Sequence, residues 1–117
     1  MEQKNNDINI IDNLKKFKKN PKKYRHWSGA IKVSEGFNYL IESLDCLWIA
    51  NLIAGYQHKL KDVKYQSWSL EHKGKDLKLS CKSFEGKTLI NQGILIEFKL
   101  DIKFVVFDRV LMLENEY

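Results

Sequence analysis

The residues with the clearest capacity for chemistry are the basic and aromatic ones between Lys15 and Trp27. This tract of thirteen residues contains seven lysine or arginine residues, three aromatic residues and no acidic residue. Basic side chains neutralise phosphates and release counterions, and aromatic rings stack on unpaired bases. The pattern predicts a site for nucleic acid or for an acidic partner, made of Lys15, Lys16, Lys18, Lys19, Lys22, Lys23, Tyr24, Arg25 and Trp27.

The same tract has a second interpretation, in which its lysines are the solvated face of a helix. We expect a basic amphipathic helix over 7–19, with Asp7 as its N-cap and Pro21 beyond its end. Three apolar residues have the spacing of one helical stripe: Ile10, Leu14 and Phe17. Only one of the seven basic residues is arginine, the better residue for bidentate phosphate contacts. Both interpretations therefore stay open.

Signatures of catalysis and of metal binding are missing from the sequence. His26, His58 and His72 are far apart and form no metal-ligand spacing. Glycine-rich phosphate loops, dinucleotide fingerprints and nucleophile elbows are also missing. We therefore predict no catalytic residue, no metal and no cofactor. An unrecognised enzyme would need a deep polar pocket with one of these histidines beside a carboxylate.

Length and composition indicate one domain over 1–117. The chain has 117 residues, of which 44% are hydrophobic and 12% aromatic, which excludes a wholly disordered protein. Of the net charge of +5, the excess lies in residues 1–30, which hold eight basic and three acidic residues. No apolar run is long enough to span a bilayer and no export signal is visible, so we expect no membrane partner. Cys46 and Cys81 are then expected as buried free thiols in the cytoplasm, although one disulfide is formally open.

Residues 34–57 have helical spacing of apolar side chains. Ser34 is the expected N-cap, because its hydroxyl can accept a hydrogen bond from an unpaired amide of the first turn. A single helix of this length would be about twice the typical one. We therefore predict two helices joined near Asp45, which is a candidate N-cap of the second.

From residue 63 the apolar period changes to the alternation of strands. The clearest strand includes Leu77, Leu79 and Cys81, and a third strand is expected over 88–98 with a bulge or bend at Gly93. The predicted fold is α+β: two or three N-terminal helices on one face of a four- to five-stranded antiparallel meander over 63–113. The last strands are apolar on both faces, so the first helix or a homodimer through 102–113 would cover them.

Several segments resemble a family of small bacterial proteins of unknown function. They are YRHW at Tyr24–Trp27, the helical segment Glu35–Gln57, YQSWSL at Tyr65–Leu70, LSC at Leu79–Cys81 and VLMLENEY at Val110–Tyr117. Members tend to have prolines after the third strand and before the C-terminal tripeptide, which this chain lacks. The resemblance implies a bacterial, cytoplasmic protein of the kind carried by plasmids, phages and other mobile elements. It implies no catalytic residue and no ligand.

These observations predict a non-enzymatic binding module that occludes or modulates a macromolecular partner. With the mobile-element context that the resemblance implies, one version is an inhibitor of a host nucleic-acid-handling defence system, such as an anti-CRISPR protein. A basic chain is no mimic of nucleic acid, so it would bind an acidic protein surface, or guide or target nucleic acid, through 15–25. The alternative is a nucleic-acid-binding protein of plasmid or phage maintenance that uses Lys15–Trp27 directly.

Overall fold

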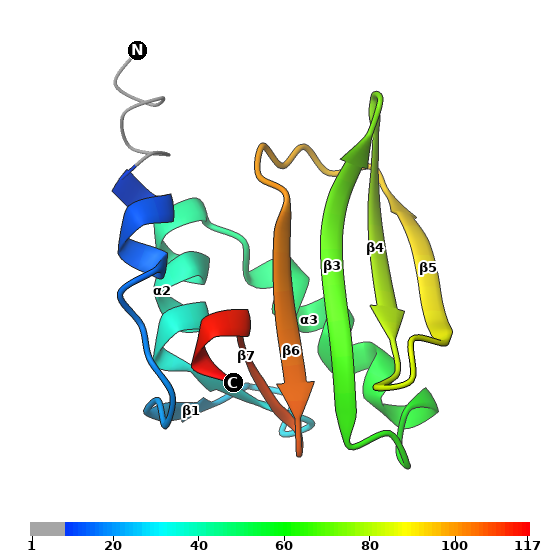
Figure 1. The fold of residues 1–117 in the computed structure, drawn as a ribbon, viewed down its shortest axis with the longest axis horizontal. Coiled ribbons are helices and arrows are strands. Elements are labelled where there is room, and N and C mark those ends of the chain that lie inside the picture. The colour runs from blue at the N-terminus through cyan, green and yellow to red at the C-terminus, as the bar shows by residue number, and fades with distance from the viewer. Residues whose placement is uncertain (1–8) are drawn as a thin grey trace.

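The computed structural model describes residues 9–117, which form a seven-stranded sheet with two helices packed on one face (Figure 1). Residues 9–14 are helical. The helices are α2 (Glu35–Leu44) and α3 (Leu47–Tyr56), with 3-10 turns η1 (Gln57–Lys59) and η2 (Glu114–Glu116). The strands are β1 (Lys23–Arg25), β2 (Lys32–Ser34), β3 (Tyr65–Lys73), β4 (Asp76–Lys82), β5 (Thr88–Ile94), β6 (Ile102–Phe107) and β7 (Val110–Leu113).

The sheet is mixed, with the strand order β1-β2-β7-β6-β3-β4-β5. Its neighbouring strands are antiparallel except for β2 and β7, which run parallel. The expected antiparallel meander of four or five strands behind N-terminal helices is therefore wrong. Two strands precede α2, and they have only three residues each, too few to show alternation. A parallel pair needs a long crossover, and this one joins segments near opposite ends of the chain (Figure 1).

The segment 34–57 contains two helices, as its spacing predicts. Ser34 is the N-cap of α2, and its Oγ accepts a hydrogen bond of 3.1 Å from the N–H of Phe37. Asp45 ends α2 in the left-handed region at φ 51°, and Cys46 precedes α3 without a side-chain cap. The expectation that Asp45 caps the second helix is therefore wrong.

The first helix ends at residue 14 instead of residue 19. The side-chain amide of Asn115 donates to the carbonyl oxygens of Leu14 (3.0 Å) and Phe17 (2.6 Å). The C-terminal segment thereby pairs with one carbonyl at the end of the helix and with another in the connector that follows it. Lysines 15, 16, 18 and 19 lie on a connector beyond the helix, and Asp7 lies outside the described residues.

The third predicted strand also ends early. β5 stops at Ile94, and residues 95–101 have no regular structure. The irregularity in this hairpin is also on β5 but at its other end: Cys81 pairs with Ile90 and Lys82 with Thr88, so Leu89, and not Gly93, is the extra residue.

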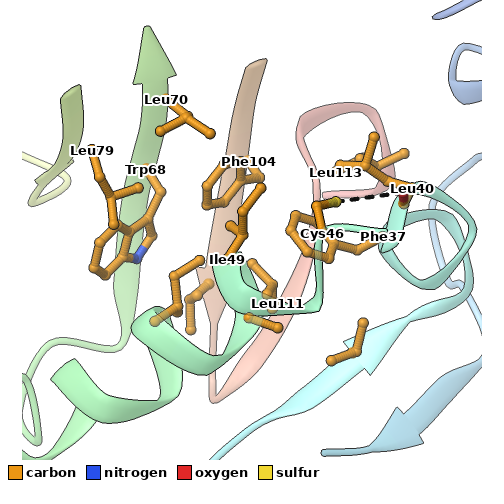
Figure 2. Packing of buried hydrophobic residues seen from close by; sticks show 14 of the residues in the cluster. Phe37, Leu40, Cys46, Ile49, Trp68, Leu70, Leu79, Phe104, Leu111 and Leu113 are labelled. Atoms are coloured by element: carbon orange, nitrogen blue, oxygen red, sulfur yellow. Dashed lines mark hydrogen bonds between the residues drawn. The ribbon is translucent and has the colours of Figure 1, made fainter. Parts of the chain in front are cut away.

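The core lies between α2, α3 and the sheet face that carries Trp68, Leu79 and Phe104 (Figure 2). Phe37 of α2 meets Phe104 of β6 edge-to-face, with ring centroids 5.3 Å apart. Both cysteines are buried free thiols in this layer, and Cys46 Sγ donates to a carbonyl of α2. No helix in the described part of the chain is long and apolar enough to cross a membrane.

The opposite face of β6 and β7 carries a second, smaller cluster. Val105, Val110 and Met112 are buried there, with Tyr65 and Phe107 packed against them. Since β6 and β7 are interior strands, neither offers a free edge. The homodimer through 102–113 stays a prediction, and it would have to use this face of the sheet.

Candidate functional site

The nine residues of the sequence-predicted site are all exposed, but the chain distributes them over three segments. The connector after the first helix holds Lys15, Lys16, Lys18, Lys19 and Lys22; β1 holds Lys23, Tyr24 and Arg25; and the turn that follows holds Trp27. The tract is thus a path across the surface and not one helix face.

Only part of the tract lines the hollow at the β1 end of the sheet. This hollow, the basic hollow below, has a volume of about 570 Å³. Its walls are β1, the turn 27–31, the start of β2 and the turn between β6 and β7. Its charged residues are Lys23, Arg25, Lys32, Asp108 and Arg109, and its aromatic residue is Trp27.

Strand pairing explains why the four cations converge. Arg25 of β1 lies directly opposite Lys32 of β2 in the antiparallel register. β2 in turn pairs with β7, and the N–H of Lys32 donates a 2.8 Å hydrogen bond to the carbonyl of Arg109. The two arginines of the chain, Arg25 and Arg109, therefore line the same hollow although they lie far apart in the sequence.

Arg109 occupies a position that ordinarily favours glycine. β6 and β7 are joined by the two-residue turn Asp108-Arg109, with φ values of 49° and 66°. Such turns prefer Asn-Gly or Asp-Gly, because both central residues have positive φ. A left-handed conformation costs a residue with a side chain roughly 1–2 kcal/mol. Backbone strain of this kind concentrates at functional sites, so the arginine is a candidate binding residue.

The charge in the basic hollow is poorly compensated. Its wall carries four cations and one carboxylate, that of Asp108. Within residues 9–117, none of the four cations lies within 4.0 Å of a carboxylate, since the ion pair found there joins His72 and Asp101. Like charges directly opposite on paired strands, as at Arg25 and Lys32, are destabilising. A bound anion would relieve this repulsion.

Trp27 stands at the margin of the hollow with 75% of its surface exposed. Its indole N–H donates a 2.8 Å hydrogen bond to Oδ1 of Asn51, which α3 supplies. The ring of buried His26 lies beside the indole, with centroids 5.2 Å apart and planes inclined by 36°. The indole is thus held in place although most of its surface faces solvent.

His26 is part of the same hydrogen-bonded group. Its Nδ1 accepts from the backbone N–H of Ser28 (3.2 Å) and lies 2.7 Å from the Ser28 hydroxyl. Because Nδ1 is an acceptor, the proton is on Nε2, which donates to Oδ1 of Asn51 at 2.8 Å. Asn51 Oδ1 therefore accepts from both His26 and Trp27.

Serine, histidine and asparagine in a hydrogen-bonded row resemble a nucleophile, a base and an orienting group. Here, however, Ser28 Oγ also accepts a 3.1 Å bond from the N–H of Ala30 and closes a local turn. We interpret the row as the support that holds Trp27. Among residues 9–117, no group of three or more histidine, cysteine or acidic residues is arranged to hold a metal.

The remaining tract residues do not join the basic hollow. Lys15 lines a separate hollow of about 430 Å³ between the first helix and β6, and Tyr24 is exposed outside both. Sequence reasoning missed three contributors: Lys32, Arg109 and Asn51. The one local signal was an arginine in a two-residue turn between apolar strands.

Comparison with known proteins places the whole described chain in one family. Residues 8–117 match the model of a protein family whose function is unknown. No curated protein and no solved structure matches the chain. Side-chain geometry therefore has to carry the functional inference.

Proposed function

Because the chain belongs to the DUF6876 family, whose function is unknown, we propose a function from its own side chains. It is a non-enzymatic binding module that holds the phosphate backbone of a nucleic acid in the basic hollow. The observation that supports this proposal is the convergence of Arg25 and Arg109 with Lys23 and Lys32 on one hollow.

Phosphodiesters fit this hollow better than single carboxylates do. Four cations spread over three segments offer several separate contacts, as a chain of phosphates requires. One arginine guanidinium can bind two phosphate oxygens at once. The presence of both arginines in this hollow therefore favours a phosphate ligand. Contacts of this kind position a nucleic acid without reading its sequence.

The salt dependence of binding tests the proposal. If all four cations neutralise phosphates, log affinity against log salt on duplex DNA has a slope of about −3 to −4, since each phosphate contributes about −0.9. Fluorescence anisotropy with labelled single and double strands measures this slope. Undetectable binding at low salt, or binding that ignores salt, would contradict the proposal.

A double variant with a charge-matched control assigns the binding to the hollow. Arg25→Gln/Arg109→Gln removes two charges from the hollow, and Lys73→Gln/Lys75→Gln removes two from the β3–β4 hairpin at another part of the sheet (Figure 1). We expect the arginine variant to lose affinity and about two units of slope. An equal loss in both variants would show that net charge, and not the hollow, attracts the nucleic acid. Thermal melting of each variant checks the fold.

The wider context remains part of the proposal. A cytoplasmic location accords with two buried free thiols. The association with mobile elements comes from the family resemblance, and inhibition of a host defence system rests on it together with the small size of the chain and the lack of catalytic motifs in its sequence. Within that picture, the basic hollow would contact guide or target nucleic acid. The alternative outcome is that the hollow binds an acidic protein surface. Displacement of a bound protein partner by heparin, but not by an oligonucleotide, would favour it.

A further inference from the structure

We infer that Trp27 is a stacking platform for one unpaired base, so that the protein selects single strands. This inference rests on the proposed function and adds the class of nucleic acid and the residue that selects it. A nucleotide whose base lies on the indole would have its flanking phosphates beside Arg25 and the other cations, because Trp27 and these cations line the same hollow.

The exposure of Trp27 distinguishes it from the other two tryptophans. Trp68 is fully buried, and half-buried Trp48 packs edge-to-face on Phe98 at 5.9 Å. Trp27 is 75% exposed and gains little from burial in its own chain. A large aromatic face in solvent beside a cationic hollow is the arrangement of single-strand binding proteins.

The hydrogen bond that the indole N–H of Trp27 donates to Asn51 gives the exposed ring a fixed orientation. Holding a side chain costs conformational entropy, and here little burial offsets that cost. Prior immobilisation reduces the ordering cost at the moment of binding. Asn51 is therefore a positioning residue, which acts through Trp27.

The geometry of stacking determines whether Trp27 can bind single-stranded or duplex nucleic acid. In a duplex both faces of each base are covered by neighbouring pairs, so the indole could reach one only by unstacking them. A single strand presents its bases without that cost. Trp27 should therefore contribute to binding of single strands and not of duplexes.

Trp27 itself reports on this contact. We would titrate the protein with an oligothymidylate of about 15 nucleotides, with a duplex of the same length and with heparin, and follow tryptophan emission. The single strand should quench the emission, and Trp27→Phe, which retains Trp48 and Trp68, should abolish most of the quenching.

Affinities of two variants separate the inference from the proposed function. Trp27→Ala should weaken single-strand binding about five- to a hundredfold, the loss expected for one base–aromatic stack. Trp27→Phe should restore part of it, and duplex affinity should change less than about twofold in both. Single-strand binding that is unchanged in Trp27→Ala would overturn the inference and leave the proposed function standing. A wild-type chain that binds no nucleic acid would overturn both.

The positioning role of Asn51 has its own readout. Asn51→Leu removes the acceptor, so the emission anisotropy of Trp27 should fall and single-strand affinity should weaken while duplex affinity stays the same. Asn51→Asp keeps an acceptor oxygen and should keep the anisotropy. Asn38→Leu on α2 is the matched control, since among residues 9–117 its amide bonds only to Glu42 in the same helix. A mobile Trp27 with unchanged single-strand affinity would contradict the role of Asn51.

Discussion

Ser34 and Glu116 join the N-terminus of α2 to the C-terminal end of the chain. The Ser34 hydroxyl donates a 2.5 Å hydrogen bond to Oε1 of Glu116, whose side chain is 2% exposed. The same carboxylate accepts from the N–H of Gly36 at 3.0 Å and of Leu113 at 2.9 Å. A helix N-terminus favours an anion at this position. The contact anchors the end of the chain beside β2, the strand that supplies Lys32 to the basic hollow.

Glu116→Gln should destabilise the fold by about 2 kcal/mol. The amide has one acceptor oxygen where the carboxylate has two, so its NH₂ would face a buried donor, and hydrogen bonds to charged groups contribute about 1.5–3 kcal/mol. Urea unfolding at neutral pH measures the free energy. Glu114→Gln, an exposed neighbour, is the control and should change little. Equal effects in the two variants would argue against the buried network.

Two helical glycines should respond oppositely to alanine. A Cβ on Gly36 would lie 2.6 Å from the Glu116 carboxylate, so Gly36→Ala should displace that group and destabilise the protein. A Cβ on Gly55 of α3 meets no atom of the described residues within 4 Å, and Gly55→Ala should stabilise by about 0.4–1 kcal/mol. Thermal unfolding of both variants provides the comparison. A stabilising Gly36→Ala would show that the carboxylate is not held as tightly as described.

Arg109→Gly should raise stability while it weakens binding. Glycine relieves the left-handed strain at φ 66°, which is worth about 1 kcal/mol, and removes a cation of the basic hollow. Urea unfolding and oligonucleotide anisotropy on the same sample measure the two effects. Arg25→Gly, in a strand, should lose affinity without the gain in stability. A variant that becomes more stable and binds as before would remove Arg109 from the site.

Both cysteines should resist thiol reagents in the folded protein. Burial raises the pKa of Cys46 and of Cys81 to about 12, from 9.0, so neither forms thiolate at neutral pH. Because the folded pKa is the higher one, unfolded thiols ionise first, and the free energy of unfolding should fall as the pH rises above about 9. Absorbance with an aromatic disulfide reagent should show two thiols only after denaturation. Rapid reaction of the native protein would contradict the burial.

Asp101 should titrate at unusually low pH. Hydrogen bonds from the side chain and then from the backbone N–H of His72, at 2.6 Å and 2.9 Å, lower the pKa of its carboxyl group. Its stabilising contribution is present above the ordinary carboxyl range and is lost as the pH falls through the folded pKa. His72→Ala should raise the pKa only part of the way, because the backbone bond remains. Carbon-detected NMR of the carboxyl group follows it, and an unchanged titration in the variant would exclude the side-chain bond as the cause.

The sequence predicted the elements whose residues repeat a pattern over several turns or several pairs. The alternation around Leu79 and Cys81 appears as buried residues of β4, and Ser34 caps α2 as expected. These features depend on neighbours close in the chain, which is why local periodicity reports them.

Two of the errors lie where distant segments decide the structure. β1 and β2 are held by pairing to each other and to β7, and not by any preference visible in three residues. The first helix ends at residue 14, where the side-chain amide of Asn115 donates a hydrogen bond to the carbonyl oxygen of Leu14. Neither the pairing with β7 nor the contact with Asn115 can be identified from the local sequence of the strand or helix concerned.

The candidate site also has a part that the sequence indicated and a part that only the tertiary structure revealed. By itself the sequence determined that a dense basic and aromatic tract, which includes Lys23, Arg25 and Trp27, precedes a body of no net charge. Only the tertiary structure decided which of those residues face one another, because the parallel pairing of β2 with β7 brings Arg109 to Arg25. Charges act through space over a few ångströms, so a hollow of like charge exists only after the fold has closed those distances.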